Sequence, residues 1–360
     1  EMPTRRRFYL APFAALYGAV VGIRNWLYNS QTLKSRSYPI PIICVGNIAV
    51  GGTGKSPMVE YLVRLLKQSY RVAVVSRGYK RRSRGLVCAG RGKDASEEQI
   101  GDELKQLLLL HPDVMVVADG NRCRAVEYLL SMESDERPQV ILMDDGMQHR
   151  RIKPSFTIML TDYEHPFTED ALLPLGRLRE TPKGRLRADC LIVTKCPEEL
   201  SPIQKSLTKR NLSLFPHQRV FFTSILYKEP KPLFEDVAER TAESSYQRIS
   251  AIAGIASPEP FFRHLTERYE CPVTQLSYPD HHHFTESDVR SWNKLADESA
   301  TLFITTTKDA ARLRSLRSVM SAKLVATFFV LPIEMRFLFG EEPHFQSLIC
   351  QQLPRKSNTL

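Results

Sequence analysis

The stretch VGNIAVGGTGKSPMV, residues 45–59, determines how the rest of the chain is interpreted. A short apolar run with β-branched side chains over residues 40–45 precedes the glycines and predicts a buried strand. Apolar residues at helical spacing follow over residues 58–66, with Pro57 near the first turn, where proline is tolerated. A strand, a glycine-rich loop and a helix in this order are the context of a phosphate-binding loop.

The residue types in this loop suit the binding of phosphate and magnesium. Three glycines let backbone N–H groups point at phosphate oxygens. Lys55 supplies a positive charge for the outer phosphates, and Ser56 offers a hydroxyl to Mg²⁺. The predicted nucleotide-binding residues of the loop are Gly51, Gly52, Thr53, Gly54, Lys55 and Ser56. The alternative is a turn that only joins a strand to a helix, and the Gly-Lys-Ser trio argues against it.

A second, acidic element predicts where the metal ion is held. The apolar strand over residues 140–143 is followed by Asp144, Asp145 and Gly146. A carboxylate at the end of such a strand holds Mg²⁺ directly or through water, opposite Ser56. The sequence leaves open which of the two aspartates contacts the ion.

Strands and helices alternate along the chain, which predicts an α/β fold. Further strands are expected over residues 71–76, 114–118, 156–160 and 190–194, and one helix over residues 97–110. This pattern is typical of a P-loop NTPase-like, mostly parallel sheet flanked by helices.

The chain is long enough for two domains, since it has 360 residues. Its character changes at residues 220–233, which are extended and interrupted by prolines, and a second α/β pattern follows. We expect an N-terminal helix over 1–30, a P-loop domain over 31–219, linker strands over 220–233 and 324–340, a smaller α/β domain over 234–323, and a C-terminal helix over 341–354 that returns to the first domain.

The N-terminal segment favours contact with a membrane. Residues 8–23 are uncharged and mostly apolar, with three arginines before them and Arg24 after them. This run is slightly short for a bilayer span, so we expect a helix at the membrane interface with arginines near lipid phosphates. The alternatives are a true span, a signal peptide, and a helix packed on the soluble core.

The charge of the chain points to anionic partners. The formal net charge is +10, and a loop over residues 77–84 concentrates basic side chains after a predicted strand. A small anion or a lipid headgroup explains this loop better than nucleic acid, because no nucleic-acid-binding motif is present. The seven cysteines are scattered and mostly in apolar runs, which predicts reduced thiols without a disulfide framework or a zinc site.

Three consecutive histidines, His281, His282 and His283, suggest a metal site at first sight. Consecutive residues do not share a face on a helix or a strand, so three ligands from one run give poor geometry. An acid/base or phosphate-binding role for one of them is the better hypothesis.

Taken together, these motifs resemble the tetraacyldisaccharide 4'-kinase family. The resemblance covers nearly the whole chain and rests on the ordered set RNWLY, VGNIAVGGTGKSP, SRGYKR, GDE, DDGMQHR, LLPLGRLRE, YPDHHHFT and TTTKDAARL. Local departures from the family pattern are Met147, where an aromatic is expected, and Thr307, where a glutamate is usual. Ala49, at the first glycine of the usual P-loop pattern, agrees with the family.

The resemblance implies an activity, a fold and a location. It implies transfer of the γ-phosphoryl group of ATP to the 4'-hydroxyl of tetraacyldisaccharide 1-phosphate, which forms lipid IVA in lipid A biosynthesis. The implied cofactors are ATP and Mg²⁺, and the implied partners are the lipid substrate and an anionic membrane surface, with no nucleic acid and no obligate protein partner. The implied location is the cytoplasmic face of the inner membrane, in a peripheral or monotopic form. The implied fold joins the P-loop domain to the smaller domain by a two-stranded linker.

The resemblance also assigns roles to individual residues. Asp102 of the GDE motif would be the base that takes the 4'-hydroxyl proton, helped by His281, while Lys55 would offset charge on the transferred group. The further candidates are Glu180 for the metal ion, Arg77, Tyr79 and Arg179 for the substrate, and Gln148 for ATP.

Two other classes of protein remain open at this stage. One is a soluble P-loop ATPase or GTPase that acts as a switch, which would hydrolyse nucleotide without a lipid acceptor. The other is a membrane-associated structural protein with a vestigial P-loop. The intact Gly-Lys-Ser trio and the pair of aspartates count against the second class.

Overall fold

The computed structural model describes residues 4–234, 236 and 246–354. The chain divides into two compact units. Unit 1 contains residues 1–104, 111–225 and 335–360, and unit 2 contains residues 105–110 and 226–334.

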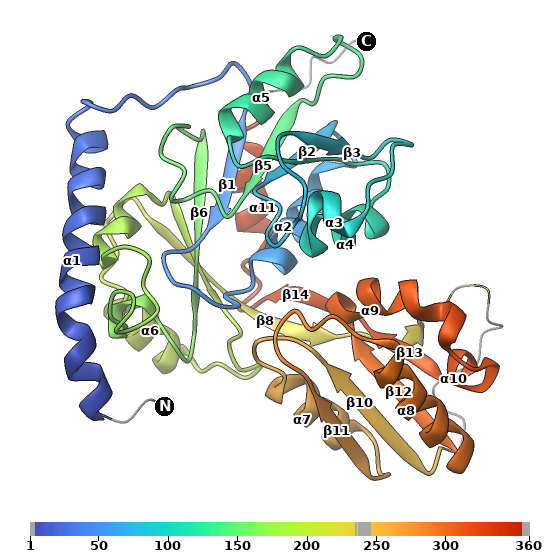
Figure 1. Cartoon of the computed structure of the whole chain (residues 1–360). Coiled ribbons are helices and arrows are strands. Elements are labelled where there is room, and N and C mark those ends of the chain that lie inside the picture. Colours follow the sequence, from blue (N-terminus) through green and yellow to red (C-terminus); the bar gives the residue numbers. More distant parts are fainter. Residues whose placement is uncertain (1–3, 235, 237–245, 355–360) are drawn as a thin grey trace. The chain divides into compact units, whose positions relative to one another are not determined.

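Unit 1 is organised around a nine-stranded sheet with the order β14-β8-β7-β6-β1-β5-β2-β4-β3 (Figure 1). Its strands are β1 (Ile42–Gly46), β2 (Val72–Ser76), β3 (Val87–Ala89), β4 (Met115–Ala118), β5 (Val140–Asp144), β6 (Phe156–Asp162), β7 (Cys190–Thr194), β8 (Arg219–Tyr227) and β14 (Ile333–Phe337). Neighbours from β8 to β4 pair in parallel, and β3 is antiparallel to β4. Strand β1, which leads into the glycine-rich loop, is buried throughout, as expected for a parallel strand covered on both faces.

Helices cover this sheet and connect its parallel strands. They are α1 (Thr4–Asn29), α2 (Lys55–Leu66), α3 (Glu97–Ile100), α5 (Arg122–Leu130), α6 (Pro202–Asn211) and α11 (Glu342–Cys350), with short 3₁₀ turns at η1 (Phe167–Glu169) and η2 (Pro182–Arg187). Helix α4 (Asp102–Leu110) begins in unit 1, and its residues 105–110 are assigned to unit 2. Helix α2 packs on β1 and β5, and α5 packs on β2. The parallel order brings the carboxyl ends of β1, β5 and β2 side by side, where such sheets bind ligands.

The single helix predicted over residues 97–110 is wrong, because the structure has two helices with a break at Gly101. Gly101 has a φ of 86°, in the left-handed region, and a Cβ there would lie 2.7 Å from the carbonyl oxygen of Tyr79. The backbone angle and the close approach both require glycine. The break makes Asp102 the first residue of α4.

Unit 2 is a smaller α/β unit around a five-stranded sheet with the order β11-β10-β12-β13-β9. Its strands are β9 (Lys231–Pro232), β10 (Arg248–Ala253), β11 (Val273–Ser277), β12 (Thr301–Thr306) and β13 (Phe328–Leu331), and its helices are α7 (Glu259–Arg268), α8 (Glu286–Glu298), α9 (Thr307–Leu313) and α10 (Ala322–Ala326), with a 3₁₀ turn η3 (Arg314–Val319). Trp292 and Phe328 belong to one hydrophobic cluster of this unit, and Phe261 and Phe262 of α7 belong to another.

The linker predicted over residues 324–340 is partly wrong. Strand β13 pairs in parallel with β12 and antiparallel with β9, inside the five-stranded sheet. Leu324 belongs to helix α10 and not to a strand. The buried apolar run of β13 has the same composition as any core strand, so the sequence alone did not separate it from a linker.

Helix α1 has two different faces. One face carries large, exposed apolar side chains, namely Tyr9, Phe13, Leu16, Val20, Ile23 and Trp26. The other face contacts unit 1, where the hydroxyl of Tyr17 donates a 2.8 Å hydrogen bond to the carbonyl oxygen of Arg179 (Figure 1 shows α1 in blue). Among the described residues, Tyr9–Asn29 is the one helical segment long and apolar enough to cross a membrane by length and composition.

The predicted fold class is confirmed. The structure has a large, mostly parallel sheet, a second and smaller sheet, and an apolar, exposed N-terminal helix.

Candidate active site

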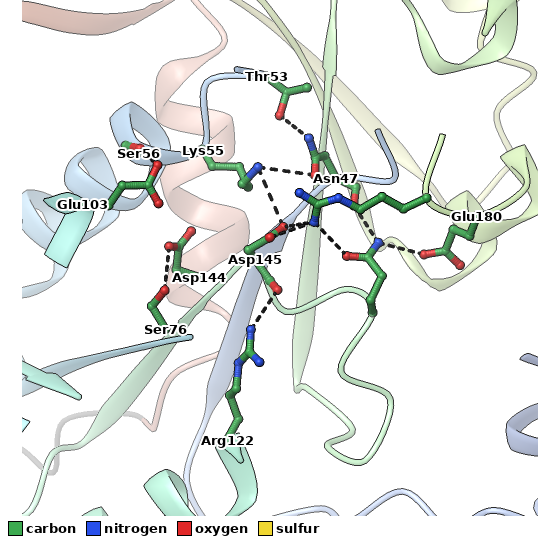
Figure 2. Close-up of polar contacts among 12 residues, drawn as sticks. Asn47, Thr53, Lys55, Ser56, Ser76, Glu103, Arg122, Asp144, Asp145 and Glu180 are labelled. Atoms are coloured by element: carbon green, nitrogen blue, oxygen red, sulfur yellow. Dashed lines mark hydrogen bonds and ion pairs between the residues drawn. The ribbon is translucent and has the colours of Figure 1, made fainter. Parts of the chain in front are cut away.

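The glycine-rich loop is shaped by its own backbone and by one buried asparagine. Gly51 and Gly54 have φ values of 110° and 83°, which favour glycine. The amide of Asn47 donates a 2.6 Å hydrogen bond to Oγ1 of Thr53, and Nζ of Lys55 donates to Oδ1 of Asn47 at 3.4 Å. Asn47 therefore holds both the loop and the lysine (Figure 2). Its role was not predicted, although a polar residue directly after a buried strand is a usable signal.

Asp144 is a buried carboxylate with an incomplete set of partners. It is 6% exposed, and its Oδ2 accepts a 3.2 Å hydrogen bond from the hydroxyl of Ser76. Its Oδ1 is buried without a hydrogen-bond partner among the described residues. Burial, followed by the nearby charges of Glu103 and Asp145, raises the pKa of Asp144 to about 7. A cation at this carboxylate would relieve all three effects.

Asp145 is placed between two cations. Nη1 of Arg179 contacts its two carboxylate oxygens at 3.0 and 2.7 Å, and Nζ of Lys55 lies 3.8 Å from its Oδ1. Burial opposes ionisation of Asp145, but Lys55 and Arg179 outweigh burial and lower its pKa. Asp145 is therefore an ionised partner for the lysine of the loop.

Ser56 and Glu103 extend the acidic cluster toward the loop. The hydroxyl of Ser56 donates a 3.1 Å hydrogen bond to Oε1 of Glu103, the residue after Asp102. Within residues 4–234, 236 and 246–354, no group of three or more His, Cys, Asp and Glu side chains is arranged to hold a metal ion on its own. Mg²⁺ needs no such group, because it binds through one or two carboxylates together with waters and nucleotide phosphates. Ser56 and Asp144, with its unpartnered oxygen, fit that requirement.

Glu180 is almost fully buried, at 2% exposure, and both of its oxygens accept hydrogen bonds. Oε1 accepts from Arg187 at 2.6 Å and from Gln148 at 2.9 Å, and Oε2 accepts from Asn25 of α1 at 3.1 Å. The amide of Gln148 also donates to the carbonyl oxygen of Asn47 at 2.8 Å. These contacts tie helix α1 to the loop region.

Arg122, which the sequence analysis did not single out, is a buried cation beside Asp144 and Asp145. It is 7% exposed, and its Nη2 lies 3.5 Å from the carbonyl oxygen of Asp145. Its Nε is buried without a hydrogen-bond partner among the described residues. Burial lowers the pKa of Arg122. A buried arginine with unused donors is suited to an anion.

The loop after β2 carries the predicted substrate residues Arg77 and Tyr79. Both are exposed. A Cβ on Gly78 would lie 2.8 Å from the carbonyl oxygen of Ile100, so this loop runs against the turn that precedes Asp102. Two segments far apart in the sequence are thereby placed together in unit 1. Oδ1 of Asp102 accepts a 2.9 Å hydrogen bond from the N–H of Glu103, the next residue of α4.

His281 lies in unit 2, in the loop that follows β11. Its φ is 59°, its N–H donates to the carbonyl oxygen of Gly254 at 3.0 Å, and its Nε2 lies 3.7 Å from Oδ2 of Asp280. The three histidines have different surroundings. His282 is held by Asp288, with Nε2 and Oδ2 3.3 Å apart, and His283 is exposed.

Comparison with known proteins identifies one family over nearly the whole chain. The family model described as tetraacyldisaccharide-1-P 4'-kinase matches residues 6–354. A tetraacyldisaccharide 4'-kinase of Porphyromonas gingivalis is 45% identical over 343 residues, which is 94% of each chain. The chain belongs to the tetraacyldisaccharide-1-P 4'-kinase family.

Other members of the family agree with this assignment. A tetraacyldisaccharide 4'-kinase of Flavobacterium johnsoniae is 42% identical over 348 residues, covering 96% of this chain and 97% of the relative. The crystal structure of LpxK from Aquifex aeolicus in complex with ATP is 29% identical with a TM-score of 0.73, and the match covers 97% of this chain and 99% of that chain.

Family membership confirms the function expected from the motifs. The chain is a kinase with tetraacyldisaccharide 4'-kinase activity in lipid A biosynthesis. The alternatives of a switch ATPase and of a structural protein are not supported by these relatives.

Proposed function

We propose that this kinase takes the γ-phosphoryl group from Mg-ATP at the loop of residues 51–56 and transfers it to the 4'-hydroxyl of tetraacyldisaccharide 1-phosphate. The observation that carries the proposal is the buried Asp144, whose Oδ1 has no hydrogen-bond partner within the part of the chain that the structure describes. The structure of LpxK from Aquifex aeolicus is in complex with ATP, which supports ATP as the donor.

The loop residues would stabilise the charge that develops on the transferred group. Lys55 is held by Asn47 and Asp145, so its ammonium group is already oriented before nucleotide binds. Ser56 and Asp144 would hold Mg²⁺, which supplies charge neutralisation on the phosphate oxygens. Asp145 is occupied by Lys55 and Arg179, so we assign it to the orientation of the lysine.

Three residues receive different roles from those expected from the resemblance. We leave Glu180 out of the magnesium set, because three donors already occupy its oxygens. We assign Gln148 to support of the loop through Asn47, and not to contact with ATP. We assign Arg179 to Asp145, and not to the lipid phosphate.

The acceptor side of the reaction needs a base and a site for the 1-phosphate. Asp102 would accept the 4'-hydroxyl proton, and His281 of unit 2 is the residue we propose to assist proton transfer, since carboxylates and imidazoles are common general bases. Arg77 and Tyr79 are exposed in the loop that runs against the turn before Asp102. A guanidinium there suits the phosphate of the acceptor.

The exposed apolar face of α1 would place the enzyme on a lipid surface. Its large side chains, from Tyr9 to Trp26, lie on the face opposite to the one that contacts unit 1. An apolar helix face with basic residues at its ends binds the boundary between headgroups and acyl chains. We propose a peripheral or monotopic enzyme at the cytoplasmic face of the inner membrane.

Transfer of labelled γ-phosphate from Mg-ATP to tetraacyldisaccharide 1-phosphate in detergent micelles tests the reaction and the base. Wild type should transfer the label, and Asp102→Ala should lose roughly 10²–10⁴-fold in kcat. Asp113→Ala, at an exposed ion pair of unit 1, is the matched control and should keep full activity. Equal transfer by wild type and Asp102→Ala would rule out Asp102 as the base. Hydrolysis of ATP without transfer to the lipid acceptor would rule out the assigned reaction.

Flotation with anionic phospholipid vesicles tests the membrane role separately. Phe13→Glu combined with Val20→Glu places charges on the exposed face of α1 and should reduce recovery with the vesicles. Leu207→Glu, on the exposed side of α6, is the control with the same chemistry. Unchanged flotation of the α1 variant would refute the anchor.

A further inference from the structure

Unit 2 contains a buried ion pair, Asp309 and Arg312, which contacts the backbone at and beside the histidine loop. Strands β11, β10 and β12 are parallel neighbours, so their carboxyl ends lie along one edge of the sheet. The segments that leave this edge are the loop to His281, the turn at Gly254 and the helix α9 with Asp309 and Arg312. Neither member of the pair has a role in the reaction as described so far.

The carboxylate of Asp309 is fully buried and fully partnered. Its exposure is 0%. Oδ2 accepts a 3.0 Å hydrogen bond from the N–H of Gly254 and a 2.6 Å hydrogen bond from the hydroxyl of Thr306. Oδ1 accepts from Nη2 of Arg312 at 2.7 Å. Asp309 thus joins the end of β12 to the turn after β10.

The guanidinium of Arg312 continues this connection into the histidine loop. Nη1 donates to the carbonyl oxygen of His282 at 3.0 Å, and Nη2 donates to the carbonyl oxygen of Gly254 at 3.3 Å. The side chain of Arg312 is 5% exposed. The planar fork of arginine is needed to reach both carbonyl groups and the carboxylate at once, which lysine cannot do.

Gly254 is the point at which these contacts meet the backbone of His281. Its carbonyl oxygen accepts from both Arg312 and the N–H of His281, and its own N–H is held by Asp309. A Cβ at Gly254 would lie 3.1 Å from Oδ1 of Asp309 and 3.3 Å from Cβ of His282. The close approach explains the glycine.

The backbone of His281 needs such support. Its φ of 59° is in the left-handed region, which is uncommon for residues other than glycine. An uncommon conformation of this kind persists when the surroundings determine it at several points. Here the points are the Gly254 carbonyl on one side and the Arg312 contact to His282 on the other.

We propose that Asp309 and Arg312 are positioning residues for the phosphoryl-transfer reaction, which fix the backbone turn that aims the imidazole of His281. This inference rests on the proposed role of His281 in proton transfer. The pair is costly to bury, and a buried ion pair often contributes little to stability relative to apolar residues of similar size. Its contacts to the carbonyl group of His282 and to both backbone groups of Gly254, whose carbonyl oxygen accepts from the N–H of His281, account for its presence.

The test is a double-mutant cycle in the full chain, with kcat, the KM for ATP and the thermal midpoint measured in detergent micelles. Arg312→Lys keeps the charge beside Asp309 and removes the fork. We expect kcat to fall by roughly 10²-fold, as for a reacting group displaced by about 1 Å, with unchanged KM for ATP and a thermal midpoint that stays well above the assay temperature. In the His281→Ala background the same substitution should lower kcat by at most about threefold further.

A second variant covers the case in which Arg312→Lys does not fold. Asp309→Asn combined with Arg312→Met removes both charges together, so no uncompensated charge stays buried. This double variant should fold and lose kcat to the same degree as Arg312→Lys. Arg290→Met, at an exposed ion pair on α8, is the matched control and should keep wild-type kcat.

The outcomes separate the inference from the proposal on which it rests. Wild-type kcat in His281→Ala would overturn the role of His281 itself. A loss in His281→Ala, combined with wild-type kcat in the folded Arg312 variants, would overturn the positioning role alone. Losses that multiply in the double mutant would also overturn it, because the pair would then act independently of His281.

Discussion

Asp144 in unit 1 and Asp309 in unit 2 are buried aspartates near the carboxyl ends of parallel strands in two mostly parallel sheets. Asp144 is the last residue of β5, and Asp309 is three residues beyond the end of β12. They differ in their partners. Among the described residues, one oxygen of Asp144 has no hydrogen-bond partner, and two other carboxylates lie nearby. Both oxygens of Asp309 are occupied by an arginine, a hydroxyl and a backbone N–H.

This difference shows how one kind of residue serves two purposes at the same edge of a sheet. A buried carboxylate with complete partners fixes the backbone around it. A buried carboxylate with incomplete partners raises the energy of the empty site and is stabilised by a cation that binds there. Completeness of hydrogen bonding, and not residue type or burial, distinguishes the two.

The largest effect on kcat is expected from substitution of Lys55, the lysine of the glycine-rich loop. Lys55→Ala should lower kcat by roughly 10³-fold, because the charge on the transferred group loses its oriented cation. Measurement of transfer to the lipid acceptor at saturating Mg-ATP checks this. Lys67→Ala, at an exposed ion pair on the C-terminal side of α2, is the control. Near wild-type kcat in Lys55→Ala would place the transferred group elsewhere.

At Asp309, whose hydrogen-bond partners are complete, loss of one charge should strongly lower the stability of unit 2. Asp309→Asn alone leaves Arg312 buried without its carboxylate and should destabilise unit 2 by about 3 kcal/mol. Chemical denaturation followed by the fluorescence of Trp292, which is buried in this unit, measures the effect. Addition of Arg312→Met should restore most of the loss. Equal stability of the single variant and wild type would contradict the comparison.

At Asp144, whose hydrogen-bond partners are incomplete, loss of the charge should raise stability. The pKa of Asp144 in the folded chain is about 7, above its ordinary value of 3.8. The folded state therefore holds the proton more tightly than the unfolded state, and the carboxyl group costs stability as pH rises from about 4 to about 7. Asp144→Asn should stabilise the metal-free protein at pH 8 by about 1–2 kcal/mol.

Thermal unfolding in EDTA and in excess Mg²⁺ checks this prediction. Wild type should gain more stability from Mg²⁺ than the variant, since ligand binding to the folded state raises stability by mass action. Destabilisation of the metal-free protein by Asp144→Asn would show that its carboxylate is as well partnered as that of Asp309.

A smaller effect on stability is expected at His149, which titrates in the opposite direction to Asp144. Burial, together with the positive charge of Arg122, lowers the pKa of His149 to about 4. The unfolded state then binds the proton more tightly, so this residue costs stability as pH falls from about 6.5 toward about 4. His149→Gln should reduce that loss by about 1 kcal/mol, after allowance for the solvent exposure of the ring. Thermal midpoints measured at pH 5 and pH 7 should therefore draw closer together.

The sequence predicts best what depends on residues close together in the chain. The glycine-rich loop with Lys55 and Ser56, and the strand that ends in Asp144, are continuous patterns with a direct physical meaning. The alternation of strands and helices gave the fold class for the same reason. The break at Gly101 was missed because it depends on a contact with Tyr79 from another segment.

Partners that are distant in the sequence were not predictable by spacing. Arg122 was missed because its role comes from the arrangement of strands and not from a local pattern. Asn47 carried a local signal, a polar residue directly after β1, but its partners Thr53 and Lys55 are seen only in the folded loop. The resemblance assigned Glu180 to a metal ion, and the sequence carries no sign of the three donors that reach its carboxylate from residues 25, 148 and 187. Arg312 and Gly254 likewise meet only in the folded unit.

The two faces of helix α1 have a consequence for the kinetics of the enzyme. One face is exposed and apolar, and the other is hydrogen-bonded to Arg179 and Glu180, so about 10 Å, the diameter of a helix, separates the proposed lipid surface from that network. A lipid acceptor would then be phosphorylated without leaving its leaflet. The rate would follow the mole fraction of acceptor in the membrane and not its bulk concentration, so inert lipid added at constant acceptor would slow the reaction by two-dimensional dilution.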